Sequence, residues 1–159
     1  APFSFFNVVA TSPPTVMFSA GRHPDRPKDS VEFAERTGVF TVNIVSAELA
    51  ESMSITSGSF GPDDDEFAIA GLTAVPGTMV DAPMVGEAPA NLECEVVEVV
   101  DIGVEGRTRM VIGEVVAIHV REDALDGTRV KHEVIDAVGR LAGSGYVTSR
   151  DRFEITRPS

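Results

Sequence analysis

The alternation of hydrophobic and polar residues predicts a chain made mainly of β-strands. Runs rich in β-branched and aromatic residues recur along it, and turn-forming residues separate most of them. Two runs, 92–102 and 109–120, are long, and the segment Gly103-Val104-Glu105-Gly106 between them predicts the turn of a hairpin. The other predicted strands are residues 2–10, 15–20, 39–45 and 134–138.

Helical periodicity is confined to short segments. Residues 31–36 place apolar and acidic positions on opposite sides of two helical turns, and Gly38 marks their end. Residues 47–54 and 66–70 predict two more short helices, and the proline- and glycine-rich stretch 72–89 predicts a surface connection. Because the strands alternate without regular helices between them, the pattern favours an antiparallel barrel with a long hairpin over a doubly wound sheet.

The two long strands carry further information on burial. Cys94 falls on the apolar face of strand 92–102, where we interpret it as a packed core thiol, and Glu93 falls on the polar face. After Val97 the alternation shifts phase, which predicts a β-bulge. Strand 109–120 is almost continuously apolar, which predicts burial on both of its faces.

Length, composition and charge limit the classes of protein. The 159 residues suit a single domain, and 43% hydrophobic with 24% charged residues is typical of a globular protein. A formal net charge of −12 argues against nucleic acid or an anionic membrane as the main partner, since both would be repelled. No apolar run approaches the ~20 residues of a membrane span. One cysteine permits no intrachain disulfide and favours a reducing, cytoplasmic setting.

Motifs for metal binding and hydrolysis are missing from the sequence. The acidic run 63–66 lacks the alternating ligands, central glycine and distal glutamate of a calcium loop, so we interpret it as a helix N-terminal charge cluster. The three histidines show no metal-binding spacing, and Ser144 does not lie in a nucleophile elbow. We predict neither a metal site nor a catalytic acid, base or nucleophile.

A basic loop precedes the first predicted helix. Arg22, Arg26 and Lys28 cluster directly before a helix start at Asp29-Ser30, where Ser30 can act as the cap. The first turn of a helix leaves backbone N–H groups unpaired and carries the positive end of the helix dipole, so a phosphate would fit here. A solvated, charged loop explains the same residues equally well.

Two other positions leave two interpretations open. Thr11-Ser12-Pro13-Pro14 forms a stiff turn that either presents backbone groups to a flat ligand or simply connects two strands. Asn43 interrupts an apolar strand, and its amide either satisfies local backbone groups or faces a ligand.

Six blocks in order make the chain similar to the flavin reductase-like branch of the FMN-binding split-barrel superfamily. They are APFSFFNVVATSPP, RPKDSVEFAERTGVFTVNIV, DEFAIAGLTAVPGTMVDAPMV, NLECEVVEV, VIGEVVAIHV and GRLAGSGY. The resemblance implies a mainly β protein: an antiparallel six-stranded split β-barrel of Greek-key type with a few short α-helices. It also implies a homodimer with FMN near the subunit interface. The family's upstream strand with its arginine-proline pair is absent, so we expect residues 1–159 to be one FMN-binding domain that lacks an N-terminal strand.

The resemblance also implies the positions that contact FMN. Ala10, Thr11 and Ser12 would line the isoalloxazine ring, with Asn7 beside them. Lys28, Asp29 and Ser30 match a Lys-Asp-Thr block at the ribityl phosphate, and Ser30 keeps the hydroxyl group. The predicted site is completed by Asn43, by Arg140 in a block where Ala142 replaces a glycine, and by Arg22 in the basic loop.

The implied activity is transfer of hydride from NAD(P)H to FMN, with reduced flavin passing to a partner monooxygenase or another acceptor. Such a reaction needs placement of the two rings rather than a protein acid or base, which agrees with the absence of a catalytic dyad. Two alternatives remain: an electron-carrying, flavoredoxin-like FMN protein without reductase activity, and a barrel without flavin that serves as an interaction or ligand-binding module.

Overall fold

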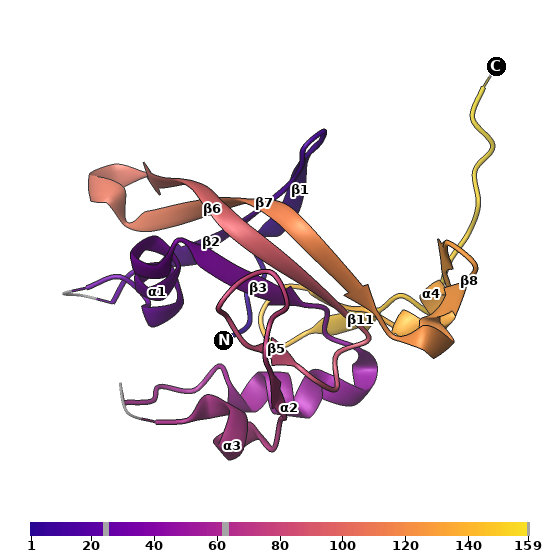
Figure 1. Cartoon of the computed structure of the whole chain (residues 1–159), viewed down its shortest axis with the longest axis horizontal. Coiled ribbons are helices and arrows are strands. Elements are labelled where there is room, and N and C mark those ends of the chain that lie inside the picture. The colour runs from indigo at the N-terminus through magenta and orange to yellow at the C-terminus, as the bar shows by residue number, and fades with distance from the viewer. Residues whose placement is uncertain (24–25, 62–63, 159) are drawn as a thin grey trace.

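The protein is built around one antiparallel sheet of five strands, seen in a computed structural model that describes residues 1–23, 26–61 and 64–158. The strand order is β1-β2-β7-β6-β3, and the β6–β7 hairpin forms the long diagonal of Figure 1. The bounds are Phe6–Thr11 for β1, Pro14–Gly21 for β2, Val39–Asn43 for β3, Ala90–Ile102 for β6 and Thr108–Val120 for β7.

Short helices and two-stranded hairpins surround this sheet. The α-helices are α1 (Asp29–Thr37), α2 (Ala50–Ile55), α3 (Glu66–Ala70) and α4 (His132–Ile135). Single 3-10 turns lie at Ala47–Leu49, Val104–Gly106 and Glu122–Ala124. The small hairpins pair β4 (Ala74–Val75) with β5 (Met84–Val85), β8 (Leu125–Asp126) with β9 (Arg129–Val130), and β10 (Val138–Arg140) with β11 (Tyr146–Thr148). Within the described ranges, no helix is long and apolar enough to cross a membrane.

The core lies between α1 and one face of the sheet. Every second residue of β2 is buried, and Val31 and Ala34 of α1 pack against the same cluster. Phe18 meets Phe40 of β3 edge to face, with ring centroids 5.2 Å apart. Cys94 is fully buried in this cluster, which confirms its interpretation as a core thiol. The buried residues of the cluster are Val16, Phe18, Ala20, Val31, Ala34, Phe40, Cys94 and Val111.

The long hairpin bends where its sequence pattern changes phase. Its register shifts between Glu93 and Cys94 and again between Val96 and Glu98, and the second shift confirms the predicted bulge. At the bend, Gly113 lies beneath the ring of Phe40, and a Cβ on that glycine would come within 2.4 Å of the ring carbon Cε1. A larger residue at position 113 would therefore displace the Phe40 ring from its place in the core.

The predicted fold class is confirmed, while several details are wrong. The chain is mainly β with short helices, but the sheet contains five strands within the described residues, and a sixth strand stays a prediction. Residues 134–135, predicted as the start of strand 134–138, belong to α4 instead, and Asp136 ends that helix in the left-handed region at φ 42°. β7 is not buried on both faces: Ile118 is 61% exposed.

Glu93 is the largest departure from the sequence pattern. Predicted on a polar face, it is fully buried, because its carboxylate accepts hydrogen bonds from three consecutive backbone N–H groups, those of Thr78 (3.0 Å), Met79 (2.7 Å) and Val80 (2.8 Å). The Thr78 hydroxyl also donates to it at 2.7 Å, and His119 Nε2 lies 2.5 Å away.

The carboxylate of Glu93 therefore holds part of the stretch predicted as a surface connection. Val80, Met84, Ala88 and Pro89 of that stretch are buried, so the prediction for 72–89 is wrong in that part. Burial by itself raises the pKa of Glu93, but the Thr78 hydroxyl, the backbone N–H groups and His119 outweigh it and hold that pKa far below its usual range. The side chain is thus ionised at neutral pH.

A second polar contact fixes α1 on the hairpin. Arg109 of β7 donates to both carboxylate oxygens of Glu35, at 2.6 and 2.9 Å, and its Nε donates to Asp101 at 3.0 Å. The hydrogen bond with Glu35 and the charges of both carboxylates raise the pKa of the Arg109 guanidinium. Bidentate geometry favours this orientation of α1 over others.

We predict that Glu93→Gln lowers the free energy of unfolding by about 2–3 kcal/mol at pH 7, because a neutral amide is a weaker acceptor and turns an N–H toward other donors. Since the folded state lowers the pKa of Glu93, its stabilising contribution is present above the unfolded value of about 4.3 and is lost as the pH falls below it. The difference between wild type and variant in urea unfolding should accordingly shrink below about pH 4.

The matched control is Glu95→Gln, which changes the same residue type on the same strand at an exposed position. It should leave the free energy of unfolding within about 0.5 kcal/mol of wild type. Equal losses for both variants would show that the buried carboxylate has no special role.

Candidate functional site

The N-terminus of α1 provides a positively polarised surface with free hydrogen-bond donors. Lys28 occupies the N-cap position, and its carbonyl accepts from Val31 N at 2.9 Å and Glu32 N at 3.1 Å. No side chain caps the helix, so Ser30, predicted as a cap, is instead a first-turn residue. The N–H groups of Asp29 and Ser30 and the exposed Lys28 ammonium are therefore available to an anion.

The loop before α1 closes on itself and contains an ion pair. Arg22 and Pro27 form an isolated antiparallel bridge, which brings the two ends of the loop together. Arg26 donates to the carboxylate of Asp29. This pairing offsets the negative charge of Asp29 beside the helix N-terminus, where it would otherwise oppose a phosphate.

The turn between β1 and β2 lies at the other end of β2. Thr11 stands opposite Pro14 in the hairpin, Ser12 lies in the turn, and Asn7 is an exposed residue opposite Met17. β2 has eight residues between this turn and the basic loop, a length of about 25 Å at the usual strand rise. A single chain thus does not bring Ala10, Thr11 and Ser12 next to Lys28.

Asn43 is engaged inside the protein. Its Oδ1 accepts from the backbone N–H of Val85 at 2.8 Å and from the amide of Asn91 at 2.7 Å, and that same amide donates to the Val85 carbonyl at 3.1 Å. The oxygen of Asn43 thereby holds β5 against the end of β3. Of the two interpretations of Asn43, the structure supports the first for its side-chain oxygen, which forms hydrogen bonds with groups of the protein itself.

Arg140 closes its own hairpin. The guanidinium donates twice to the carbonyl of Gly143, at 3.1 and 2.6 Å, and lies over the ring of Tyr146 with Cζ 5.3 Å from the centroid. Gly143 has φ +63°, a conformation that suits glycine. The turn is thus stable although Ala142 replaces the usual glycine.

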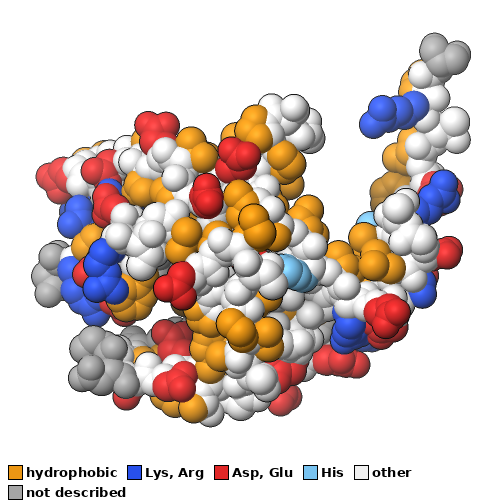
Figure 2. All heavy atoms as spheres, viewed as in Figure 1, with side chains coloured by type: hydrophobic (Ala, Val, Ile, Leu, Met, Phe, Trp, Pro, Cys, Tyr) orange, Lys and Arg blue, Asp and Glu red, His pale blue; other side chains and the backbone are white. Residues whose placement is uncertain are grey.

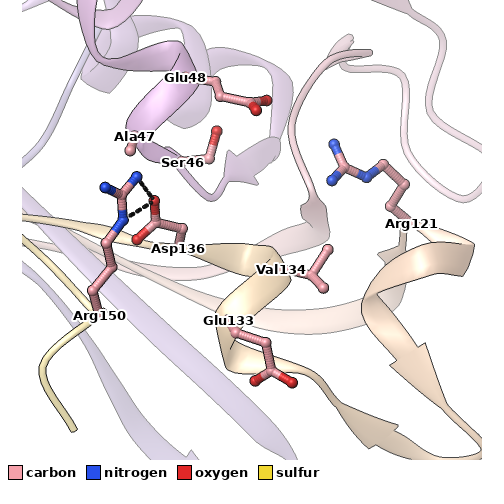
Figure 3. A pocket seen from close by; sticks show the side chains of 8 residues that line it. All are labelled: Ser46, Ala47, Glu48, Arg121, Glu133, Val134, Asp136 and Arg150. Carbon is pink, nitrogen blue, oxygen red and sulfur yellow. Dashed lines mark hydrogen bonds and ion pairs between the residues drawn. The ribbon is translucent and has the colours of Figure 1, made fainter.

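A polar cavity of about 250 Å³, for which the sequence pattern carries no signal, lies at the far end of the sheet (Figure 3). Arg150 donates to Oδ2 of Asp136 at 2.6 and 2.9 Å, while Oδ1 of Asp136 is buried without a partner. Because separate segments supply its walls, no local motif predicts it. It is lined by Ser46, Ala47, Glu48, Arg121, Glu133, Val134, Asp136 and Arg150, and contains none of the predicted site residues.

Comparison of the sequence with known proteins identifies the family of this chain. A model of the flavin reductase like domain matches residues 1–140. An uncharacterised protein of Deinococcus radiodurans is 42% identical, over 99% of this chain and 70% of its own length.

Solved structures agree with the sequence match. Nitrilotriacetate monooxygenase component B from Bacillus cereus has a TM-score of 0.92 at 30% identity, over 98% of this chain and 78% of its own. A flavin reductase described as having a split barrel domain, from Shewanella frigidimarina, has a TM-score of 0.87 at 24% identity, over 98% and 77%. Flavoredoxin of Desulfovibrio vulgaris has a TM-score of 0.81 at 25% identity, over 96% and 79%. The chain belongs to the flavin reductase like domain family.

Proposed function

We propose that this protein binds FMN and transfers hydride from NAD(P)H to it. The observation that carries the proposal is the N-terminus of α1, where Lys28 and free backbone N–H groups stand beside a carboxylate that is already ion-paired. This donor set suits a dianionic phosphate, since it combines a positive charge with several hydrogen-bond donors. Lys28, the N–H groups of Asp29 and Ser30, and the Ser30 hydroxyl would hold it, with Arg22 nearby.

The isoalloxazine ring would lie against the turn formed by Ala10, Thr11 and Ser12, with Asn7 beside it. Because the length of β2 separates this turn from Lys28 within one chain, a site shared between two copies fits both groups of residues better. A homodimer with FMN near its interface, which the family resemblance implies, supplies such a site. The exposed, rigid turn offers a flat ligand fixed backbone groups.

Bound FMN supplies an electron-accepting ring that takes hydride from a nicotinamide stacked on it. The chain's own residues supply placement. Burial, followed by the charge of Glu93, raises the pKa of the Cys94 thiol to about 12, so this cysteine stays protonated and enclosed. The ionised carboxylate of Glu93 is occupied by internal donors. These two buried groups are therefore structural, which is consistent with a reaction that needs no protein acid or base.

Two features of the relatives suggest where the electrons go. Similarity to a monooxygenase component supports delivery of reduced flavin to a partner oxygenase. Similarity to flavoredoxin supports the alternative of a protein that keeps its flavin and exchanges electrons with another protein. We favour the reductase because the higher structural similarity is to the monooxygenase component. The cytoplasmic setting stays a prediction.

We predict that the purified protein with added FMN oxidises NADH or NADPH in steady state, because the flavin is reduced and then reoxidised by an acceptor. Absorbance at the nicotinamide band measures the rate, and a flavin spectrum after gel filtration measures retention of FMN. Yellow protein reduced only by a protein partner would support the flavoredoxin-like alternative. Colourless protein without flavin affinity would overturn both hypotheses, the flavin reductase and the flavoredoxin-like protein.

We predict that Lys28→Ala weakens FMN binding by roughly ten- to a hundredfold and leaves riboflavin binding almost unchanged, because only FMN carries the phosphate. Isothermal titration with both ligands measures the two affinities. The matched control is Arg107→Ala, which removes one positive charge from the β6–β7 turn, where the side chain is 80% exposed. If Lys28→Ala weakened both ligands equally, the loop would not hold the phosphate.

A further inference from the structure

The chain ends in an extended segment that stands away from the body of the protein (Figure 1). We call residues 150–158 the C-terminal arm. It has no helix or strand, and it presents two large apolar side chains to solvent: Phe153 is 84% exposed and Ile155 is 79% exposed. Packing both side chains against another surface would remove their apolar area from water.

Two ion pairs attach the arm to the rest of the chain at its base. Arg150 pairs with Asp136, and Arg152 pairs with Glu133 at 3.3 Å. Among the described residues, the part of the arm after Arg152 makes no hydrogen bond or ion pair with the body. These ion pairs tie the base of the arm to α4 and to the residue that follows it, and Phe153 and Ile155 lie beyond them.

The arm and the body have complementary charges. The arm contains three arginines against Asp151 and Glu154, so its formal charge is +1. The other residues contain ten basic and 23 acidic side chains, a formal charge of −13. Acidic side chains lie among hydrophobic ones over the face of the body seen in Figure 2. A mildly basic, apolar segment therefore suits the surface of another copy of the same acidic body.

The arm also encloses a space. A groove of about 620 Å³ is lined by His132 of α4 and by Arg150, Arg152, Phe153 and Glu154 of the arm. Figure 2 shows the hollow between the arm and the body. The matched family domain ends at residue 140, so the arm lies outside the part that this chain shares with the family model.

We propose that the C-terminal arm packs against a second copy of this chain, with Phe153 and Ile155 as its apolar contacts. The inference rests on the homodimer of the proposed function and identifies an element that binds the partner. In a two-fold dimer each copy supplies one arm and receives one, so every contact of the arm is made twice. Burying two large apolar side chains per arm adds substantially to such an interface.

The first test uses the intact chain and trypsin. Cleavage after Arg152 should slow as the protein concentration rises, with the same midpoint as dimer formation measured by light scattering. Cleavage after Arg107, in the exposed β6–β7 turn, serves as the internal control and should not depend on concentration. Protection of Arg152 that is independent of concentration would mean that the arm binds within its own chain, which overturns the proposal.

The second test compares dimer dissociation constants by sedimentation equilibrium. Phe153→Ala combined with Ile155→Ala should raise the constant at least tenfold, whereas Val104→Ala, at a position 78% exposed on the β6–β7 turn, should not. An unchanged constant in the double variant would overturn the role of the arm, and so would a monomeric wild type. NAD(P)H turnover is measured in parallel, so that loss of the arm contact and failure of the reductase activity are told apart.

Discussion

The fold depends on one buried negative charge. Removing the Glu93 carboxylate from water is costly, and the protein compensates with three successive N–H groups, a hydroxyl and a histidine. These donors come from the 78–80 turn and from β7, while Glu93 itself is on β6. One carboxylate thereby determines where a long connection crosses the sheet. At Gly77 a Cβ would lie 2.3 Å from the Val80 carbonyl oxygen, so this turn also requires glycine.

The candidate site depends on similar contacts at its periphery. Arg109 holds the second half of α1 on the hairpin through Glu35, and the packing of Val31 and Ala34 fixes the helix against the core. These contacts fix the position of α1, while its N-terminus has no side-chain cap because Lys28 occupies the N-cap position. The N–H groups of Asp29 and Ser30 are therefore held at a defined place on the surface.

Local sequence patterns predicted the elements whose formation depends on neighbouring residues in the sequence. The long hairpin and the bulge follow from alternation, and α1 follows from its periodicity and from Gly38, which adopts φ 75° at the helix end. The prediction for Glu93 was wrong because the alternation of polar and apolar residues carries no information on hydrogen-bond donors 15 residues away in the sequence. The 132–135 helix was missed because β-branched residues favour a strand locally and tertiary context overrides that preference. The family resemblance supplied the site residues, which no motif in the chain defines by itself.

A flavin reductase needs few chemical groups of its own. For this reason no short catalytic motif identifies such a protein, and the resemblance is spread over several sequence blocks. If the cofactor carries the electrons, the protein must hold two rings in contact and balance the charge of a phosphate. In the proposed function, backbone N–H groups, a stiff turn and one lysine would meet those needs, and many sequences are compatible with each of them. The residues with the most specific contacts are instead structural: Glu93 holds the 78–80 turn, Gly113 leaves room for the Phe40 ring, and Arg109 holds α1 on the hairpin. Because Arg109 holds the helix that carries the proposed phosphate site, loss of its contact with Glu35 would weaken both the fold and the proposed binding of FMN.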